Sequence, residues 1–459
     1  MDTNTKTLPR LMITAAGSGS GKTTITCALL RALLQKNMQP AAFKCGPDYI
    51  DPMFHSRVIG APSRNLDLFM LGADKCRYLL AKNATQGIAV LEGVMGYYDG
   101  VSTSTQASSY ELAKATSTPV ILLVNAKGAA LSLAATIKGF MQFRTDSNIQ
   151  GVILNNINKG VFDFYKQALE NECGVPLLGY FPPLPPEDTF ASRHLGLVTA
   201  AEIDNLREIA DRLAKVAIQT LDWDKLLSIA QQAPALSYQT YTIDKVAAVK
   251  IAVAADKAFC FYYQDSLQLL QELGAQLIEF SPLTDSSLPD CDGLYLGGGY
   301  PELYADKLSA NTVLRKQIKD KLAQGMPCIA ECGGFMYLND SIVQDNQATP
   351  MVGIFNSQAI MGNKLSRFGY ITLTSNNDNL LAKCGESINA HEFHYSDSTD
   401  NGTAFNAAKP LSKRSWECVH ATPSIFAGYP HLHLWGNIEF ARRFVAKCHE
   451  YHVAHANHI

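Results

Sequence analysis

The segment AAGSGSGKTT, residues 15–24, decides how the first half of this 459-residue chain folds. It follows the short apolar run 11–15 and leads into 23–34, which has a helical composition. Glycines in such a place let backbone N–H groups turn toward phosphate oxygens, and the start of a helix adds the positive end of its dipole. Strand, glycine-rich turn and helix in this order predict a phosphate-binding loop on an α/β fold.

Within this loop, Lys22 is expected to reach the β- and γ-phosphates of ATP, and Thr23 to ligate Mg²⁺. The strict pattern GxxxxGK[ST] would place a glycine where the chain has Ala16. Backbone freedom comes instead from other residues of the loop, and we include these in the predicted nucleotide site: Gly17, Gly19, Gly21 and Thr24. The alternative is a glycine-rich turn that binds nothing, and the strand–loop–helix context disfavours it.

Short apolar runs continue the same pattern through the first half. They are 87–91, 120–124 and 151–154, each bounded by polar or glycine-containing turns. Near-continuous apolar strands separated by helices are typical of a parallel sheet covered on both faces. With closing helices at 206–217 and 221–229, we predict a P-loop α/β domain over 1–230.

The segment QQAPALSYQTY, residues 231–241, is polar, contains a proline and lacks a helical period. We therefore predict a linker over 231–247. Strand and helix patterns then start again, which predicts a second α/β domain over 248–459. Four histidines near the end recur every three residues and are interpreted as a polar terminus: His449, His452, His455 and His458.

Composition excludes several classes of protein. The net charge is −3, with 47% hydrophobic and 18% charged residues, and this balance argues against a dedicated nucleic-acid or membrane-surface binder. No apolar run approaches the roughly 18 residues that span a bilayer, and residues 1–10 lack the apolar core of a signal peptide. The 11 cysteines are scattered without a CxxC motif, which indicates reduced thiols and a cytoplasmic protein.

Two acidic clusters follow the phosphate loop. FKCGPDYIDP, residues 43–52, carries Lys44, Asp48 and Asp51, and LEGVMGYYDG, residues 91–100, carries Glu92 and Asp99. Glu92 directly follows an apolar run, so it is expected at the carboxyl end of a strand, where open α/β sheets bind ligands. Such carboxylates can hold a metal ion and orient the acceptor of a phosphoryl group.

The second half contains a candidate nucleophile in PCIAECGGFMYL, residues 327–338. Cys332 follows an apolar run and precedes two glycines and a helical stretch, which is the order of a nucleophile elbow. A helix N-terminus favours the thiolate. The glycines of LGGGYPE, residues 296–302, could present a backbone N–H group to a developing oxyanion, and Gly298 and Gly299 are the ones we include. The alternative is a buried inert thiol.

The cysteine needs a base, and GYPHLHLWGN, residues 428–437, offers two histidines. Residues two apart on a strand face the same side, so His431 and His433 could both point at Cys332. Their spacing does not choose between them. His391 and His394 form an HxxH pair, which is weak evidence for zinc without a third ligand.

Taken in order, these motifs resemble the cobyrinate a,c-diamide synthase family over nearly the whole chain. Three further stretches support the resemblance: NLDLFM (65–70), PPEDTFASRHLGL (185–197) and HEFHYS (391–396). That family joins a dethiobiotin-synthetase-like ATP domain to a class I glutamine amidotransferase domain of flavodoxin-like α/β fold. The resemblance implies a carbon–nitrogen ligase that takes ammonia from glutamine.

The resemblance also implies a mechanism and roles. Cys332 would attack glutamine and release ammonia. ATP would phosphorylate a carboxylate of cobyrinic acid, and the ammonia would convert the phosphorylated carboxylate to an amide. The a and c acetates would react in succession. Many class I members have a glutamate two residues after the histidine, whereas Leu432–His433–Leu434 offers no acid, as in a Cys–His dyad. In the first domain, the resemblance implies that Asp48 and Glu92 bind Mg²⁺ together with Thr23. Tyr49, Asp51 and Asp99 would lie near the reacting carboxylate. Asn155 or Asn156 would contact adenine.

A tetrapyrrole with many carboxylates needs cationic contacts, and the candidates are Lys44, Arg57, Arg64, Arg193 and His194. Hydrogenobyrinic acid and nickel-sirohydrochlorin are alternative substrates, because the motifs do not separate them. A P-loop switch ATPase would leave Cys332 without a role, and a glutaminase with a regulatory nucleotide domain would not need the acidic clusters. The expected partners are small molecules, with a homodimer as a candidate assembly.

Overall fold

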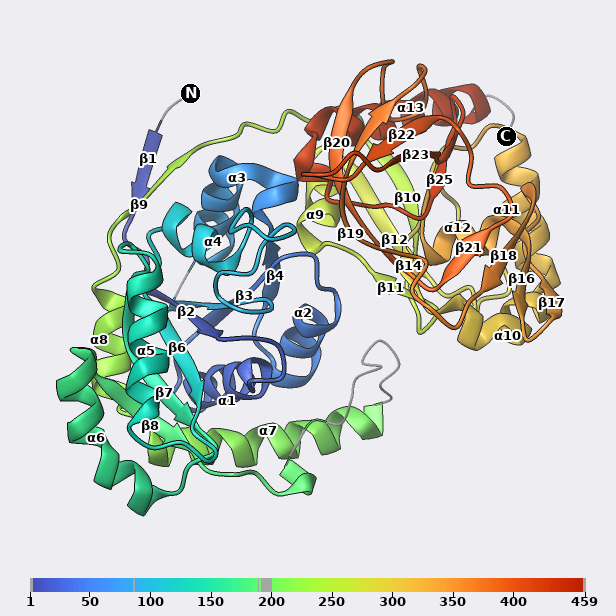
Figure 1. Cartoon of the computed structure of the whole chain (residues 1–459). Helices are drawn as coiled ribbons and strands as arrows, with labels where there is room; N and C mark the ends of the chain where they lie inside the picture. Colours follow the sequence, from blue (N-terminus) through green and yellow to red (C-terminus); the bar gives the residue numbers. More distant parts are fainter. Residues whose placement is uncertain (1–2, 86, 189, 191–199, 457–459) are drawn as a thin grey trace. The chain divides into compact units, whose positions relative to one another are not determined.

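The computed structural model describes residues 3–85, 87–188, 190 and 200–456 (Figure 1). By their internal contacts the residues fall into two units, Met1–Tyr241 and Thr242–Ile459. Each unit is an α/β structure, as the sequence predicts. Within the described ranges, no helix is long and apolar enough to cross a membrane.

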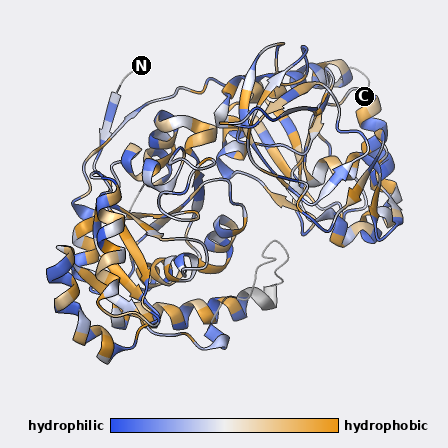
Figure 2. Cartoon of the chain, viewed as in Figure 1, coloured by the Kyte–Doolittle hydropathy of each residue, from blue (hydrophilic) through white to orange (hydrophobic). Residues whose placement is uncertain are grey.

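The first unit is built on a seven-stranded parallel sheet with the order β4-β3-β5-β2-β6-β7-β8. Its strands are β2 Arg10–Ala15, β3 Pro40–Cys45, β4 Ser63–Leu66, β5 Ile88–Glu92, β6 Val120–Asn125, β7 Ile149–Asn155 and β8 Leu177–Phe181. Strands β2, β3 and β5 are buried along their whole length, and a strand covered on both faces has no need for polar alternation. Figure 2 shows the hydrophobic colour most clearly on strands β6 and β7 of this sheet.

Helices cover this sheet and lead from one strand to the next. They are α1 Lys22–Gln35, α2 Ile50–Phe54, α3 Leu68–Asn83, α4 Ser109–Ala115, α5 Ser132–Phe143, α6 Lys159–Cys173, α7 Ala200–Thr220 and α8 Trp223–Gln231. The apolar face of α1 packs against α7 in the main core cluster. The strands and helices predicted from the apolar runs of this half are confirmed, because their signals are local and strong.

The segment predicted as a linker is partly regular structure. Strand β9, Leu236–Gln239, pairs antiparallel with β1, Thr3–Lys6. The buried Arg10 donates a hydrogen bond from Nη2 to the carbonyl of Pro234 at 2.7 Å. This strand escaped sequence reasoning because its partner lies at the other end of the unit.

The second unit contains a six-stranded sheet with the order β12-β10-β13-β15-β25-β24, parallel except for the edge strand β24. Its strands are β10 Val249–Ala254, β12 Ala275–Phe280, β13 Gly293–Leu296, β15 Cys328–Glu331, β24 His420–Ala421 and β25 Ile425–Gly428. The helices of the unit are α9 Gln264–Glu272, α10 Ala305–Ala310, α11 Thr312–Ala323, α12 Gly333–Leu338 and α13 Ile438–Ala456.

Further strands extend this unit beyond the predicted α/β pattern. A five-stranded antiparallel sheet, β23-β22-β19-β20-β26, consists of β19 Arg367–Ser375, β20 Ser387–His394, β22 Phe405–Ala408, β23 Ser415–Cys418 and β26 His431–Leu432. The others are β16 Asn339–Gln344, β17 Gln347–Pro350, β18 Phe355–Met361 and β21 Ser396–Ser398 in one sheet, and β11 Phe259–Phe261 with β14 Gly298–Gly299.

The structure shows a helix where the sequence analysis expected only a polar terminus around the last histidines. Helix α13 continues to Ala456, so His449, His452 and His455 lie on its last turns. His452 Nδ1 lies 2.8 Å from Asp292 Oδ1. A spacing of three residues is close to the helical period, which was the missed signal. His458 lies outside the described residues.

One buried carboxylate on β20 has an unusual environment. Glu392 is fully buried, and no hydrogen-bond partner for its carboxylate oxygens is present in the described part of the chain. Burial raises the pKa of Glu392 to about 7, against the opposing attraction of Arg367 and Lys409. At pH values between 4.5, the ordinary pKa of a glutamate, and about 7, Glu392 therefore keeps a proton in the folded protein that it releases in the unfolded chain.

Glu392→Gln should consequently make the protein more stable at pH 8, by up to about 3 kcal/mol. The sign follows from linkage, because a raised carboxyl pKa makes stability fall as pH rises through this window. The difference between the two proteins should shrink toward pH 5, as measured by urea unfolding at both pH values. Glu279→Gln, at an exposed position on β12, is the control. An equal stability difference at both pH values would contradict this prediction.

Candidate active sites

The glycine-rich loop lies at the carboxyl end of β2, and α1 begins at Lys22. Gly21 has a φ of 91°, and a Cβ atom there would lie 2.6 Å from Asn155 Nδ2, so a side chain does not fit. Lys22 Nζ donates to the carbonyls of Gly17 at 2.8 Å and Met95 at 2.5 Å. Burial and the nearby Lys44 lower the pKa of Lys22. This is the geometry of a loop that wraps phosphate groups.

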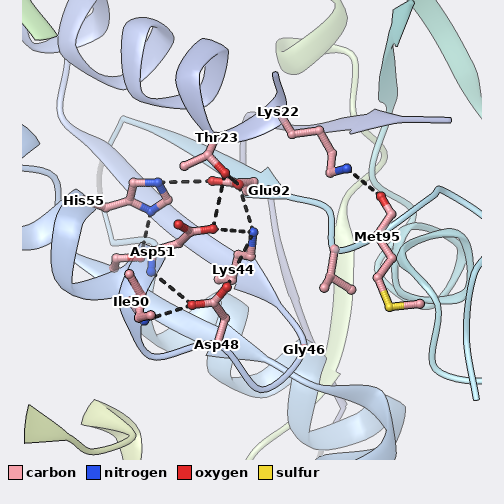
Figure 3. A network of polar contacts seen from close by, with 12 residues as sticks. Lys22, Thr23, Lys44, Gly46, Asp48, Ile50, Asp51, His55, Glu92 and Met95 are labelled. Atoms are coloured by element: carbon pink, nitrogen blue, oxygen red, sulfur yellow. Dashed lines mark hydrogen bonds and ion pairs between the residues drawn. The ribbon is translucent and has the colours of Figure 1, made fainter. Parts of the chain in front are cut away.

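Three acidic side chains from the ends of β3 and β5 and from α2 gather around Lys44 (Figure 3). Lys44 Nζ lies 2.7 Å from Asp51 Oδ2 and 2.8 Å from Glu92 Oε1. Thr23 Oγ1 donates to Glu92 Oε1 at 2.7 Å and lies 3.3 Å from Asp51 Oδ2. The threonine of the phosphate loop and the two acidic clusters of the sequence therefore meet at one place.

The electrostatics of this cluster keep Lys44 and Glu92 charged. Burial disfavours the charged form of Lys44, yet Glu92 and Asp51 raise the pKa of Lys44 above its usual value. Burial acts against the charge of Glu92 too, but Lys44 and His55 hold the pKa of Glu92 well below its usual range. The cluster is thus a compensated set of buried charges.

His55 is a member of this cluster that sequence reasoning did not single out. Its Nε2 atom lies 3.2 Å from Glu92 Oε2, and its Nδ1 atom lies 3.3 Å from Ser63 Oγ, with His55 and Glu92 fully buried. His55 follows Asp51 by four residues, the spacing that places two side chains on one helix face. That spacing was the available signal.

The two aspartates of GPDYID have different surroundings. Asp48 Oδ1 accepts hydrogen bonds from the backbone N–H groups of Ile50 at 2.9 Å and Asp51 at 3.0 Å, and its Oδ2 lies 4.0 Å from Lys44 Nζ. Asp48 therefore holds the turn into α2, whereas Asp51 faces Thr23. The geometry favours Asp51 for the metal-binding role that the resemblance assigns to Asp48.

The oxygen atoms of Thr23, Asp51 and Glu92 form a donor set that suits Mg²⁺. The ammonium of Lys44 already contacts both carboxylates and balances part of their negative charge. In the described ranges, no three His, Cys, Asp or Glu side chains converge on a preformed metal position. That finding is compatible with Mg²⁺, because Mg²⁺ is usually bound by one or two carboxylates together with phosphates and waters.

The remaining candidates of the first unit lie as follows. Asp99 Oδ2 accepts the backbone N–H of Gly96 at 2.8 Å, so it holds a loop after β5. Asn155 Nδ2 donates to the carbonyl of Ser20 in the phosphate loop at 3.1 Å, and Asn156 Nδ2 donates to Asn125 Oδ1 at 3.0 Å. Tyr49 is mostly buried beside Asp48. Arg57 and Arg64 lie on η1 (His55–Ile59) and β4, and Arg193 and His194 lie outside the described residues.

Cys332 lies at a tight turn between β15 and α12, with φ 48° and ψ −101°. Such a backbone conformation is strained for a residue with a side chain and is typical of a nucleophile elbow. Neighbouring strands hold it, because Cys332 N donates to the Gly428 carbonyl at 2.8 Å and Gly334 N donates to the Gly297 carbonyl at 3.0 Å. A Cβ atom at Gly334 would lie 2.2 Å from the Leu296 carbonyl oxygen, which explains the glycine.

The two candidate bases have different neighbours. His431, on β26, lies close enough to Cys332 for the two side chains to interact electrostatically. Burial alone would lower the pKa of His431, but Cys332 and Glu331 raise it to about 10. His433 is fully buried and stacks on the ring of Tyr263, with centroids 4.8 Å apart. His433 lies just beyond the end of strand β26, which runs from His431 to Leu432.

The glycines of LGGGYPE fit closely around this pair. A Cβ atom at Gly298 would lie 2.5 Å from His431 Cε1, and a Cβ atom at Gly333 would lie 3.1 Å from Gly299 N. Gly297 N already donates to Tyr262 Oη at 2.8 Å. Gly298 thus makes room for the imidazole, and the backbone amide of Gly299 lies beside the elbow.

Comparisons with known proteins agree with this geometry. Residues 11–195 match the CobQ/CobB/MinD/ParA nucleotide binding domain, and residues 250–438 match the CobB/CobQ-like glutamine amidotransferase domain. Over 445 residues the chain is 39% identical to the cobyrinate a,c-diamide synthase of Caldanaerobacter subterraneus subsp. tengcongensis, covering 95% of this chain and 98% of the relative. The enzyme of the same name from Salmonella typhimurium is 39% identical, covering 95% of this chain and 97% of the relative. The one from Thermoplasma volcanium is also 39% identical, covering 97% of this chain and 98% of the relative.

Proposed function

Because the chain belongs to the cobyrinate a,c-diamide synthase family, we propose that its two units perform the two halves of one glutamine-dependent amidation. The protein is an amide ligase of cobalamin biosynthesis, and its substrates are cobyrinate, glutamine and ATP. One observation supports the division of labour above all: the Cys332–His431 pair lies in the second unit, and the phosphate loop with its acidic cluster lies in the first. We place the reaction in the cytoplasm, where thiols stay reduced.

In the second unit, the Cys332 thiolate attacks the side-chain carbonyl carbon of glutamine. A C–S bond forms, the C–N bond breaks, and ammonia leaves with the proton that the His431 imidazolium donates. Water then attacks the thioester while His431 accepts its proton, which releases glutamate and restores the cysteine. The backbone amide of Gly299, beside the elbow, is suited to stabilise the oxyanion.

In the first unit, ATP activates the acceptor, because a carboxylate at neutral pH is a poor acyl donor. The acetate oxygen attacks the γ-phosphorus, ADP leaves, and ammonia then displaces phosphate from the acyl phosphate to give the amide. The backbone of residues 17–21 and Lys22 hold the β- and γ-phosphates. Thr23, Asp51 and Glu92 would hold Mg²⁺, which neutralises phosphate charge when it is bound.

Product mass spectrometry tests this function directly. The protein is incubated with Mg-ATP, glutamine and either cobyrinic acid, hydrogenobyrinic acid or nickel-sirohydrochlorin. We expect cobyrinic acid to gain two amides at the expense of two carboxyl groups. A diamide formed from another tetrapyrrole alone would keep the mechanism and change the substrate. If glutamine is hydrolysed and no tetrapyrrole is amidated, the acceptor assignment is wrong.

A further inference from the structure

We propose that Glu331 is the positioning residue of His431, so that the glutaminase site is a triad of Cys332, His431 and Glu331 rather than a Cys–His pair. In this arrangement the acid precedes the nucleophile on strand β15, instead of following the histidine along the chain. The inference rests on the proposed role of Cys332 as the nucleophile. It adds a third group to that reaction and explains how the imidazole keeps its orientation.

The contacts of the Glu331 carboxylate carry this inference. Its Oε2 atom lies 3.7 Å from His431 Nδ1, with the glutamate 1% and the histidine 2% exposed. Its Oε1 atom accepts hydrogen bonds from Tyr295 Oη at 3.2 Å and from the backbone N–H of Leu432 at 3.4 Å. Two donors therefore hold one carboxylate oxygen and leave the other facing the histidine.

This arrangement fixes the imidazole from several sides. His431 contacts Cys332 as well as the Glu331 carboxylate. Gly298 lies so close that an added Cβ atom would stand 2.5 Å from His431 Cε1. Rotation of the ring away from Cys332 would also break the contact with Glu331. The carboxylate thus selects the ring orientation and stabilises the protonated form, as the acid of a catalytic triad does.

A structural role alone accounts poorly for a glutamate at this position. A buried carboxylate without ionic or hydrogen-bonding partners is costly, and burial raises the pKa of Glu331 while His431 opposes that effect. A glutamine would satisfy Tyr295 and Leu432 equally well, because both only need an acceptor oxygen. The contact that distinguishes a carboxylate from an amide is the one with His431.

Glu331→Gln tests the inference, because it keeps the size of the side chain and removes the charge. We expect glutaminase kcat to fall by about 10²-fold, with ammonia-supported amidation unchanged. Alkylation of Cys332 by iodoacetamide, followed by mass spectrometry of the peptide, should require a pH higher by about one unit or more. The reason is that the imidazolium, once it loses the carboxylate, supports the thiolate less well.

Glu279→Gln is the matched control, because it makes the same change at an exposed glutamate of the same unit. Glu279 lies on β12, the edge strand of the sheet, three strands away from β15. We expect the alkylation profile of this variant to equal that of the parent protein. A Glu331→Gln protein with parental kcat and profile would overturn the inference, and so would a lower kcat with an unchanged profile, which would indicate a structural role.

A second variant separates this inference from the proposed function. If Cys332→Ala retains glutaminase activity, the nucleophile is assigned wrongly and the triad is refuted as well. If Cys332→Ala is inactive and Glu331→Gln is normal, only the triad is refuted. Tyr295→Phe, which removes one donor to Glu331, should lower glutaminase kcat less than Glu331→Gln does.

Discussion

Replacing Cys332 by alanine should abolish glutamine-dependent amidation, with a fall of at least about 10³-fold in rate. The thioester route needs the sulfur atom, and the variant offers no other nucleophile at the elbow. Amidation should persist when ammonium chloride replaces glutamine, because the synthetase step takes place in the other unit. The measurement is the rate of diamide formation with each nitrogen source, by mass spectrometry.

Cys384→Ala is the control for this variant. Cys384 is exposed, lies in the same unit, and its Sγ atom lies 3.4 Å from the carbonyl oxygen of Asn376. Its replacement should leave both rates unchanged. Loss of the ammonia-supported reaction in Cys332→Ala would point to misfolding, and full retention of the glutamine-supported reaction would refute the nucleophile. The outcome also separates an amidotransferase from a P-loop switch ATPase, which would not need the cysteine.

Replacing Lys22 by alanine should abolish amidation with glutamine and with ammonia alike, again by about 10³-fold. The ammonium of Lys22 is held at the loop by the carbonyls of Gly17 and Met95, where it can neutralise charge on the β- and γ-phosphates. Without it, ATP binds poorly and the acyl phosphate does not form. Hydrolysis of glutamine to glutamate should remain measurable, since that chemistry occurs at Cys332.

Lys36→Ala provides the comparison, because Lys36 caps the other end of the same helix. Its ammonium lies 5.1 Å from the ring centroid of Trp223, and the residue is at the opposite end of α1 from the phosphate loop. Phosphate release and diamide formation should be unaffected there. Unchanged diamide formation in the Lys22 variant would contradict ATP activation of the substrate and would favour a glutaminase with a regulatory nucleotide domain.

Most of the parallel architecture could be predicted from the sequence, because its strands are apolar along their whole length and are followed by helices. The antiparallel strands of the second unit gave no such signal. Strand β26 has two residues, and β20 mixes polar and apolar side chains on two differently covered faces. The register of such strands depends on partners far along the chain, which a local pattern does not encode.

The candidate sites show the same difference between features encoded locally in the sequence and features that depend on the fold. The phosphate loop and the elbow could be predicted because the residues of each are contiguous in the sequence. The sequence leaves open whether His431 or His433 pairs with Cys332, and it does not show that Asp48 holds the turn into α2 while Asp51 lies near Thr23. Glu331 was missed although it adjoins Cys332, because only the fold shows that its side chain reaches His431.

The pairing of β1 with β9 decides where the enzyme can be cut for study in pieces. A synthetase fragment that stops at residue 230 would lose β9 and the Pro234 carbonyl. Strand β1 would then be an open edge that other chains can join, and the buried Arg10 would lose one of its acceptors. A fragment that runs to Tyr241 keeps both contacts. Aggregation of the shorter fragment would therefore result from the choice of truncation site. It would not argue against a synthetase unit that folds on its own.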